Sequence, residues 1–412
     1  LARLMTREMG KVLTETRGDV QEGIDTAYYA AGETRRLFAP AAPSELYDKH
    51  AFTMRVPIGV AGLITPWNFP MAIPCWKAIP AIASGNTVVL KPATDTPATA
   101  VRLVEILEEA GVPPGVVNLV TGSGSAVGVP LVEHPDIGVI SFTGSSEVGR
   151  DIAARAGKGL KRVSLELGGK NAHLGRADAK LELALEGVIW GAFGTTGQRC
   201  TATSRLILHE KIHDRFVEML VERAERIRIG DGLDEGVEMG PVINEAQREK
   251  IHSYVELGKR EGATLLAGGE PATGGDLSKG WFYKPTVFVD VTRDMRIFRE
   301  EIFGPVLAVV KVESFEEGIE VLNDSIYGLS SSIYTQDVNK AFRAMRDFEA
   351  GIVYVNGPTI GAECHMPFGG VKNTGNGHRE GGWTVYEIFT EWKTIYVDYS
   401  GRLQRAQIDT EY

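Results

Sequence analysis

The chain has 412 residues, of which 43% are hydrophobic and 24% are charged, and its formal net charge is −10 without any block of basic residues. This length is too great for one ordinary hydrophobic core and predicts two or three domains. Because nucleic acids and anionic membranes bind clustered Lys and Arg side chains, neither is expected as a main partner.

The N-terminal sequence LARLMTREMGK begins without an initiator Met and already in a helical pattern, so we expect that part of the first domain precedes it. Residues 56–84 are strongly apolar, with Lys77 as their only charge, and are long enough to suggest a membrane span. Their five prolines would break a spanning helix repeatedly. We interpret this segment as a buried strand, a turn and a helix.

The segment 57–168 alternates short apolar runs with helical patterns. A helix is predicted between a typical N-cap at Thr96 and a stop at Gly111, and others over 125–133 and from about Ser146. Strands without polar alternation are typical of a parallel sheet that is covered on both faces. This succession predicts a Rossmann-like, doubly wound cofactor domain, with strands at 59–65, 86–92, 115–122, 137–145 and 161–169.

The second half of the chain repeats this alternation with different residues and no visible internal repeat. A helical pattern covers 211–227, and a domain boundary is expected near 168–170. The pattern predicts a second α/β domain, with strands at 205–209, 285–291, 307–314, 330–335 and 351–356.

Cys200, in the motif GQRC, is one of three widely spaced cysteines. The sequence has no CxxC or HExxH motif, so we expect neither a disulfide framework nor a metal site. Cysteines used in this way indicate a reducing, cytoplasmic setting. A thiol attacks as its thiolate, and its pKa falls near a cation, which Arg199 would supply. From its own motif alone, Cys200 would more commonly be interpreted as a buried, inert cysteine. We keep that interpretation for Cys75 and Cys364.

Three further sites could take part in chemistry. Glu166 ends an otherwise apolar strand, where burial would raise its pKa toward the range of a general base. Asn68 lies in the rigid, proline-flanked motif TPWNFP and could donate its amide hydrogens to an oxyanion. Gly144 and Ser145 stand where a strand passes into a helix, whose unpaired N–H groups suit a phosphate. The alternatives remain open: Glu166 could be an ordinary exposed glutamate, Asn68 an asparagine that only shapes a turn, and the helix start at Gly144 and Ser145 a corner without a ligand.

Six motifs occur in one order: TPWNFP (65–70), FTGSSEVG (142–149), LELGGK (165–170), GQRC (197–200), EEIFGP (300–305) and PFGG (367–370). Their combination resembles the NAD(P)-dependent aldehyde dehydrogenase superfamily over nearly the whole chain. The resemblance implies an enzyme that oxidises an aldehyde to a carboxylic acid. The sequences GQRCTATSR and PFGGVKNTGNGHREGG resemble those of the semialdehyde dehydrogenases in particular.

By this resemblance, Cys200 adds to the aldehyde carbonyl, and Asn68 with the Cys200 backbone N–H forms the oxyanion hole of a thiohemiacetal. Hydride transfer then leaves a thioester, and Glu166 activates the water that hydrolyses it. Arg199 and Phe69 are candidates for substrate binding, and Arg199 could pair with the distal carboxylate of a semialdehyde. The alternative, that Arg199 points away and structures the loop, is equally open.

The resemblance also implies a site for NAD or NADP. Lys91 would bind the adenosine ribose, and Gly144 and Ser145 would lie at the pyrophosphate. Thr94 stands where NAD-specific members usually place a glutamate that repels a 2′-phosphate, so we expect NADP to be accepted alongside NAD. The other cofactor-binding candidates are Thr65, Pro66, Trp67, Gly124, Gly128, Glu301 and Phe303.

The same resemblance implies a homodimer or homotetramer. The stretch KNAHLGRADAKLELA (170–184) departs from the family pattern, and we expect this to affect a surface or a strand end. The polar tail would be disordered or fold over a neighbouring subunit. The expected division is a cofactor domain of 1–37 and 57–168, an oligomerisation element of 38–56 and 390–400, a catalytic domain of 169–389, and a tail of 401–412.

Two other functions stay open. A coenzyme A-acylating aldehyde dehydrogenase would use the same cysteine but generally lacks a carboxylate corresponding to Glu166. A non-catalytic structural homologue would be expected to lose Cys200, Glu166 or Asn68, and all three are present.

Overall fold

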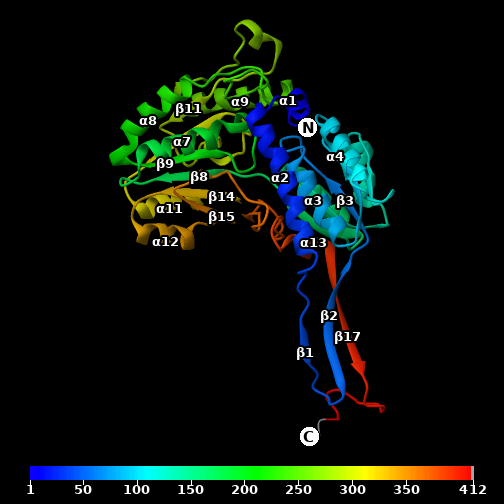
Figure 1. Cartoon of the computed structure of the whole chain (residues 1–412). Coiled ribbons are helices and arrows are strands. Elements are labelled where there is room, and N and C mark those ends of the chain that lie inside the picture. The colour runs from blue at the N-terminus through cyan, green and yellow to red at the C-terminus, as the bar shows by residue number, and fades with distance from the viewer. Residues whose placement is uncertain (410–412) are drawn as a thin grey trace.

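The structure, a computed structural model, describes residues 1–409. Two large sheets with helices on both faces make up the body of the molecule, and a narrow three-stranded sheet projects from it (Figure 1). The chain enters through α1 (Ala2–Met9) and α2 (Leu13–Glu33), and α2 packs along α3 (Ala72–Ala83) of the first large sheet.

Five parallel strands form the first large sheet, in the spatial order β5-β4-β3-β6-β7. Side chains alternate along each strand, so that Val139 joins the hydrophobic cluster on one face and Ile140 the cluster on the other. Helices α3, α4 and α13 cover the first face, and α5 and α6 the second. The strands are β3 (Val60–Ile64), β4 (Thr87–Lys91), β5 (Val117–Leu119), β6 (Ile137–Thr143) and β7 (Arg162–Glu166), and the helices are α4 (Pro97–Glu109), α5 (Val129–Glu133), α6 (Ser146–Lys158) and α13 (Val385–Phe389).

The predicted start of α4 is right, but its cap is not the predicted one. The Thr96 side chain makes no capping hydrogen bond. Instead, the carboxylate of Glu8 on α1 accepts the backbone N–H groups of Ala98 and Thr99. A carboxylate at a helix N-terminus also interacts favourably with the helix dipole, so α1 and α4 stabilise each other.

The second large sheet has seven strands in the order β10-β11-β12-β9-β8-β14-β15, of which only β10 is antiparallel to its neighbour. Helices α7 and α8 cover one face, and α9 to α12 cover the other. The strands are β8 (Asn171–Gly175), β9 (Thr203–His209), β10 (Thr264–Ala267), β11 (Thr286–Val289), β12 (Val306–Val312), β14 (Ser330–Tyr334) and β15 (Ile352–Val355), and the helices are α7 (Leu181–Phe193), α8 (Glu210–Glu225), α9 (Glu245–Glu261), α10 (Arg296–Arg299), α11 (Phe315–Asn323) and α12 (Val338–Asp347).

The stretch that departs from the family pattern contains β8, a strand that the sequence did not predict. It lies between β9 and β14, and the chain therefore passes from one large sheet to the other across residues 167–170. A Cβ on Gly175 would lie 2.8 Å from the Leu208 side chain, which explains a glycine at this strand end. The departures lie at a strand end, Gly175, and at an exposed position, Lys180, as expected, whereas Arg176 between them is buried.

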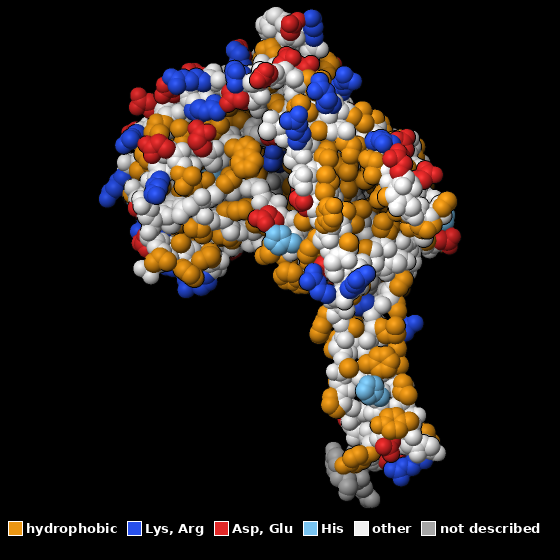
Figure 2. Space-filling model, viewed as in Figure 1, with side chains coloured by type: hydrophobic (Ala, Val, Ile, Leu, Met, Phe, Trp, Pro, Cys, Tyr) orange, Lys and Arg blue, Asp and Glu red, His pale blue; other side chains and the backbone are white. Residues whose placement is uncertain are grey.

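The projecting sheet joins two distant parts of the chain. Strand β2 (Lys49–Pro57) pairs antiparallel with β17 (Thr390–Asp398) over its whole length, and β1 (Ala41–Pro43) pairs with the other edge of β2. Apolar side chains lie exposed along this sheet (Figure 2), among them those of Phe38, Tyr47, Trp392, Tyr396 and Tyr399. A short ladder of β13 (Tyr327–Gly328) and β16 (Val371–Lys372) completes the sheets among the described residues.

Residues 401–409 of the predicted tail lie at the far end of the projecting sheet, where Gln404 donates a hydrogen bond to the Tyr47 carbonyl at 2.7 Å. Residues 410–412 of that tail lie outside the described residues. The apolar segment 56–84 forms β3 and α3, as predicted. Within residues 1–409, no helix is both long and apolar enough to cross a membrane.

Candidate active site

Cys200 lies in the loop between α7 and β9, shortly after the 3₁₀ turn Gly194–Gly197. Thr195 and Thr196 have φ angles of 51° and 58°, a left-handed conformation that β-branched residues rarely adopt. Gly197 follows at a φ of 68°, and a Cβ there would lie 2.2 Å from the carbonyl oxygen of Gly304. A backbone strained in this way persists only when surrounding groups hold it.

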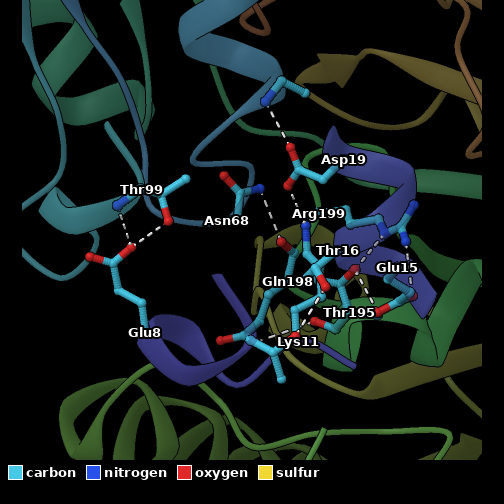
Figure 3. Close-up of polar contacts among 12 residues, drawn as sticks. Glu8, Lys11, Glu15, Thr16, Asp19, Asn68, Thr99, Thr195, Gln198 and Arg199 are labelled. Carbon is cyan, nitrogen blue, oxygen red and sulfur yellow. Dashed lines mark hydrogen bonds and ion pairs between the residues drawn. The ribbon is translucent and has the colours of Figure 1, made fainter. Parts of the chain in front are cut away.

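Glu15 of α2 is the main group that holds this loop (Figure 3). Its carboxylate accepts the backbone N–H of Thr195 at 2.9 Å and pairs with the Arg199 guanidinium at 2.9 Å. Arg199 in turn donates through Nε to Thr195 Oγ1 at 2.9 Å. The Thr196 hydroxyl donates to the Gly240 carbonyl at 3.0 Å and fixes the other side of the turn.

Arg199 does not activate the neighbouring thiol, so that expectation is wrong. Burial, followed by the carboxylates of Glu301 and Glu166, raises the pKa of Cys200 to about 12. The guanidinium lies 5.3 Å from the centre of the Phe69 ring. Among the described residues its Nη1 has no hydrogen-bond partner, since only Nε and Nη2 are engaged.

Two pockets meet at Cys200, which lines both of them together with Thr143. The aromatic pocket is also lined by Glu22, Phe69, Ala72, Ile73, Trp76, Glu166, Arg199, Thr201, Gly361, Ala362, Phe368 and Glu380. The Trp67 cleft is also lined by Pro66, Trp67, Asn68, Gly144, Ser145, Leu167, Gly168, Gln247, Lys250, Glu301 and Phe303. One reactant in each pocket would therefore meet at the same sulfur atom.

Glu166 is the last residue of β7, and its carboxylate oxygens are buried without a hydrogen-bond partner among residues 1–409. Burial, and next the Glu380 carboxylate, raise the pKa of Glu166 well above its ordinary value, in the predicted direction. Behind it, Lys77 pairs with Glu380 and donates to the Ser141 hydroxyl at 2.8 Å. A carboxyl group whose pKa is raised in this way binds a proton more readily than an exposed glutamate, which suits a general base.

Asn68 follows β3 and is buried, and its Nδ2 donates to the Gln198 carbonyl at 3.0 Å (Figure 3). An amide NH₂ has two hydrogens, so one is left for a second acceptor. Gln198 is itself fixed, because its side-chain oxygen accepts the Ile243 backbone N–H at 3.0 Å. The Asn68 amide is thus held beside the loop of Cys200, and both residues line the Trp67 cleft.

The junction of β6 and α6 lines part of the Trp67 cleft. Gly144 and Ser145 lie there, and the Ser145 hydroxyl caps α6 by accepting the Val148 backbone N–H at 3.3 Å. The buried hydroxyl of Thr143, which also lines the cleft, and the backbone N–H groups that begin α6 lie beside them. These free polar groups at a helix N-terminus suit an anionic ligand such as a phosphate.

Glu301 and Phe303 line another part of the Trp67 cleft. The Glu301 carboxylate accepts the Gly169 backbone N–H at 2.9 Å. Phe303 has a φ of 60° and packs edge to face on Trp67, with ring centres 5.5 Å apart. Gln247 of α9 donates to the Phe303 carbonyl at 2.7 Å and so holds this left-handed residue.

The remaining cofactor candidates lie around the end of β4. Lys91 is buried, its Nζ donates to the Pro92 carbonyl at 2.9 Å, and a Cβ on Gly128 would lie 3.8 Å from its aliphatic stem. Thr65 donates its backbone N–H to the Lys91 carbonyl at 3.1 Å. Thr94 is exposed three residues after Lys91. Gly124 begins a π-helical turn with open space beside it.

Several residues of the site were not identified from the sequence: Glu15, Glu22, Trp76, Gln247, Lys250, Phe368 and Glu380. Phe368 belongs to the PFGG motif, which marked its segment without giving it a role. Glu15 and Glu22 lie seven residues apart on one face of α2. Charged residues at this spacing ordinarily indicate a solvated helix face, so no local signal distinguished them.

Comparison with known proteins agrees with this geometry. The model of the aldehyde dehydrogenase family matches residues 1–395. The alpha-ketoglutaric semialdehyde dehydrogenase of Bacillus subtilis is 46% identical over 397 residues, which cover 96% of this chain and 81% of that protein. The 2,5-dioxopentanoate dehydrogenase of Saccharolobus solfataricus is 44% identical over 398 residues, which cover 96% of this chain and 82% of that protein.

A solved structure is similar over the same extent. Betaine aldehyde dehydrogenase from Staphylococcus aureus in complex with NAD+ has a TM-score of 0.95 and 37% identity, and the match covers 98% of this chain and 79% of that one. The predicted family and the predicted Rossmann-like α/β fold are thereby confirmed. The chain belongs to the aldehyde dehydrogenase family and is an NAD(P)-dependent oxidoreductase of aldehydes.

Proposed function

We propose that the protein oxidises an aldehyde to the carboxylic acid through a thiohemiacetal and then a thioester on Cys200, which water activated by Glu166 hydrolyses. The observation that carries this proposal is that Cys200 lines both pockets, with Glu166 in the aromatic pocket and Glu301 in the Trp67 cleft. An aldehyde bound in the aromatic pocket and a hydride acceptor bound in the cleft would reach the same sulfur from two sides.

In the first step the Cys200 thiol adds to the aldehyde carbonyl. Because its pKa is about 12, the thiol is protonated at neutral pH and needs a base as the S–C bond forms. Solvent water takes that proton, which leaves the Glu166 carboxylate free to act in the last step. The free Asn68 N–H and the Cys200 backbone N–H stabilise the oxyanion, and each such donor contributes about 3 kcal/mol.

The residues of the Trp67 cleft fit a nicotinamide dinucleotide. Gly144 and Ser145 would bind its pyrophosphate at the N-terminus of α6, and Glu301 would accept hydrogen bonds from a ribose. Phe303 and Trp67 would hold the ring beside Cys200. Bound NAD(P)+ supplies the hydride acceptor, and loss of hydride from the thiohemiacetal carbon leaves the thioester.

In the last step Glu166 takes a proton from the water that attacks the thioester. The C–S bond breaks, Glu166 returns this proton to the leaving Cys200 sulfur, and the acid leaves. A buried carboxyl without a hydrogen-bond partner among the described residues suits this task, because it can bind a water. The alternative, transfer of the acyl group to coenzyme A, needs no such base. Mass spectrometry of products with and without coenzyme A tests the choice. We expect free acid in both cases, and acyl-coenzyme A as the main product would contradict the proposal.

For the substrate we propose an aldehyde that carries a carboxylate at its far end, such as 2-oxoglutaric semialdehyde. Arg199 lines the aromatic pocket with a free Nη1, and a guanidinium is well suited to a carboxylate. Two relatives at 44–46% identity are named for such semialdehydes. We expect kcat/KM for 2-oxoglutaric semialdehyde to exceed that for hexanal, and a preference for hexanal would contradict this substrate class.

We further propose that both NAD and NADP are used, because Thr94 carries no negative charge that would repel a 2′-phosphate three residues after Lys91.

A homo-oligomer is proposed from the exposed aromatic side chains of the projecting sheet, among them Trp392 and Tyr396. Light scattering tests it, with a dimer or tetramer expected. Three free cysteines fit a reducing, cytoplasmic setting.

A further inference from the structure

Helix α2 contributes Glu22 to one wall of the aromatic pocket and carries two further carboxylates, Glu15 and Asp19, on the same face. Two of these carboxylates have ion-pair and hydrogen-bond partners. Glu15 pairs with Arg199, and Asp19 pairs with Lys11 at 2.9 Å and accepts the Ala72 backbone N–H at 2.7 Å (Figure 3). The Glu22 carboxylate lines the pocket and has no hydrogen-bond or ion-pair partner among residues 1–409.

The charge of this wall therefore depends on Glu22. The cations Lys11 and Arg199 are each in direct contact with one carboxylate, so these four charges cancel. With Glu22 protonated the wall is neutral, and with Glu22 ionised it carries one negative charge. Aromatic side chains on the other walls, including Trp76 and Phe368, limit the water that could screen this charge.

Glu22 can change its charge near neutral pH. Burial, followed by the Asp19 carboxylate, raises the pKa of Glu22 to about 7, against the opposing effects of Lys11 and Arg199. Other titratable or charged groups lie around Glu22: Asp25 on α2 acts on it, and it acts in turn on Cys75, Tyr354 and Cys364. Glu363 acts on Tyr354, and Glu166 and Glu380 line the same pocket as Glu22. Of these, Glu380 is paired with Lys77.

We propose that Glu22 determines the charge selectivity of the pocket for the distal end of the aldehyde. In its neutral form it donates a hydrogen bond to a distal carboxylate that Arg199 also contacts. In its ionised form it repels that carboxylate and attracts a cationic end. This proposal rests on the proposed binding of the aldehyde in the aromatic pocket. A neutral alkyl aldehyde would be indifferent to the charge of Glu22.

The test compares three probes at pH 6.0 and pH 8.5: succinic semialdehyde, which is anionic, hexanal, which is neutral, and betaine aldehyde, which is cationic. Ratios of kcat/KM remove the pH dependence that the chemical steps share. For the wild type, the ratio of succinic semialdehyde to hexanal should fall at least about fivefold between the two pH values, and the ratio of betaine aldehyde to hexanal should rise.

In Glu22→Gln, which keeps the shape and a hydrogen-bond donor, both ratios should change less than about twofold with pH. At pH 8.5 its ratio of succinic semialdehyde to hexanal should exceed that of the wild type at least about fivefold. Glu33→Gln is the matched control, because it removes the same charge from the same helix away from the pocket, and it should behave as the wild type. Equal pH dependence in Glu22→Gln and the wild type would overturn the proposal.

The wild type alone gives a second measurement, since ratios that do not change with pH would also overturn the role of Glu22. The same data distinguish failure of the proposed substrate class from failure of the proposed role of Glu22. If hexanal is preferred at both pH values, the carboxylate-bearing substrate is wrong. If succinic semialdehyde is preferred at both values and Glu22→Gln has no effect, the substrate class stands and the role of Glu22 is wrong.

Discussion

The carboxylate of Glu15 lies 2.9 Å from the guanidinium of Arg199, and this contact joins the start of α2 to the loop of the candidate nucleophile. The same carboxylate accepts the backbone N–H of Thr195, whose φ is positive. Two segments that are far apart in the sequence thus hold Cys200 in place. Arg199, which the sequence linked to the thiol or the substrate, has a structural partner on α2.

Replacing Glu15 should loosen this loop. In Glu15→Ala the Arg199 guanidinium and the Thr195 N–H lose their acceptor, so we expect a loss of about 3 kcal/mol in the free energy of unfolding. We also expect kcat/KM to fall at least about tenfold, because small displacements of a nucleophile are costly. Urea unfolding followed by tryptophan fluorescence, together with steady-state kinetics, measures both effects.

The matched control for that experiment is Glu33→Ala, which removes a carboxylate of α2 whose ion-pair partner, Arg36, is exposed to solvent. It should cost less than about 1 kcal/mol and leave kcat/KM unchanged. Equal effects of the two substitutions would mean that Glu15 has no special role in holding the loop.

The reactivity of Cys200 should follow its raised pKa. With a pKa of about 12, only a small fraction of the thiol is ionised at pH 7, so alkylation by iodoacetamide should accelerate about tenfold per pH unit up to pH 10. In Glu301→Gln one of the carboxylates that raise this pKa is removed, and labelling at pH 8 should be several-fold faster. Peptide mass spectrometry at Cys200 gives the rates. A plateau already reached at pH 8 would contradict the raised pKa.

The stability of the protein should fall as the Glu166 carboxyl ionises. Its folded-state pKa is raised above the unfolded value, so the folded state binds its proton more tightly. The contribution is fully present below the unfolded pKa of about 4 and is lost as pH rises toward the folded pKa. Relative to Glu166→Gln, the wild type should lose more than about 1 kcal/mol between pH 4.5 and pH 8. Urea unfolding midpoints of the two proteins across this pH range measure the loss. If the midpoints of the wild type and Glu166→Gln changed in parallel with pH, this prediction would be refuted.

Cofactor preference should depend on Thr94. For the wild type we expect kcat/KM with NADP to be no lower than about a tenth of that with NAD. In Thr94→Glu, repulsion of the 2′-phosphate should lower the NADP value at least about twentyfold and leave the NAD value within about threefold. Thr94→Gln has the same size without the charge and should resemble the wild type. An unchanged NADP value in Thr94→Glu would place the 2′-phosphate elsewhere.

Sequence reasoning identified the residues whose chemistry is carried by short motifs. Cys200, Glu166 and Asn68 each stand at the end of a strand or in a rigid turn, and local sequence is enough to single out such positions. Residues of the site that lie on α2 or α3 were missed, because Glu15, Glu22 and Lys77 acquire partners or a pocket only through tertiary packing.

The same limit applies to the fold. Most strands with continuous apolar runs were predicted within a few residues, but the short edge strand β10 was missed. The central strand β8 was also missed, because it contains Asn171 and His173 and lacks that pattern although it is buried. The predicted cap at Thr96 gave way to Glu8 because a carboxylate from α1 reaches the same N–H groups. Neither outcome is visible in a local window.

The most direct test of the proposed mechanism is to trap the acyl group in Glu166→Gln. This variant should form the thioester on Cys200 but hydrolyse it at least about a hundredfold more slowly than the wild type. After mixing with succinic semialdehyde and NAD+ and quenching in acid, the intact mass should rise by one acyl group. The label should lie on the peptide of Cys200, with about one equivalent of NADH formed per active site. Turnover at the wild-type rate, or NADH formation without an adduct on Cys200, would contradict the mechanism.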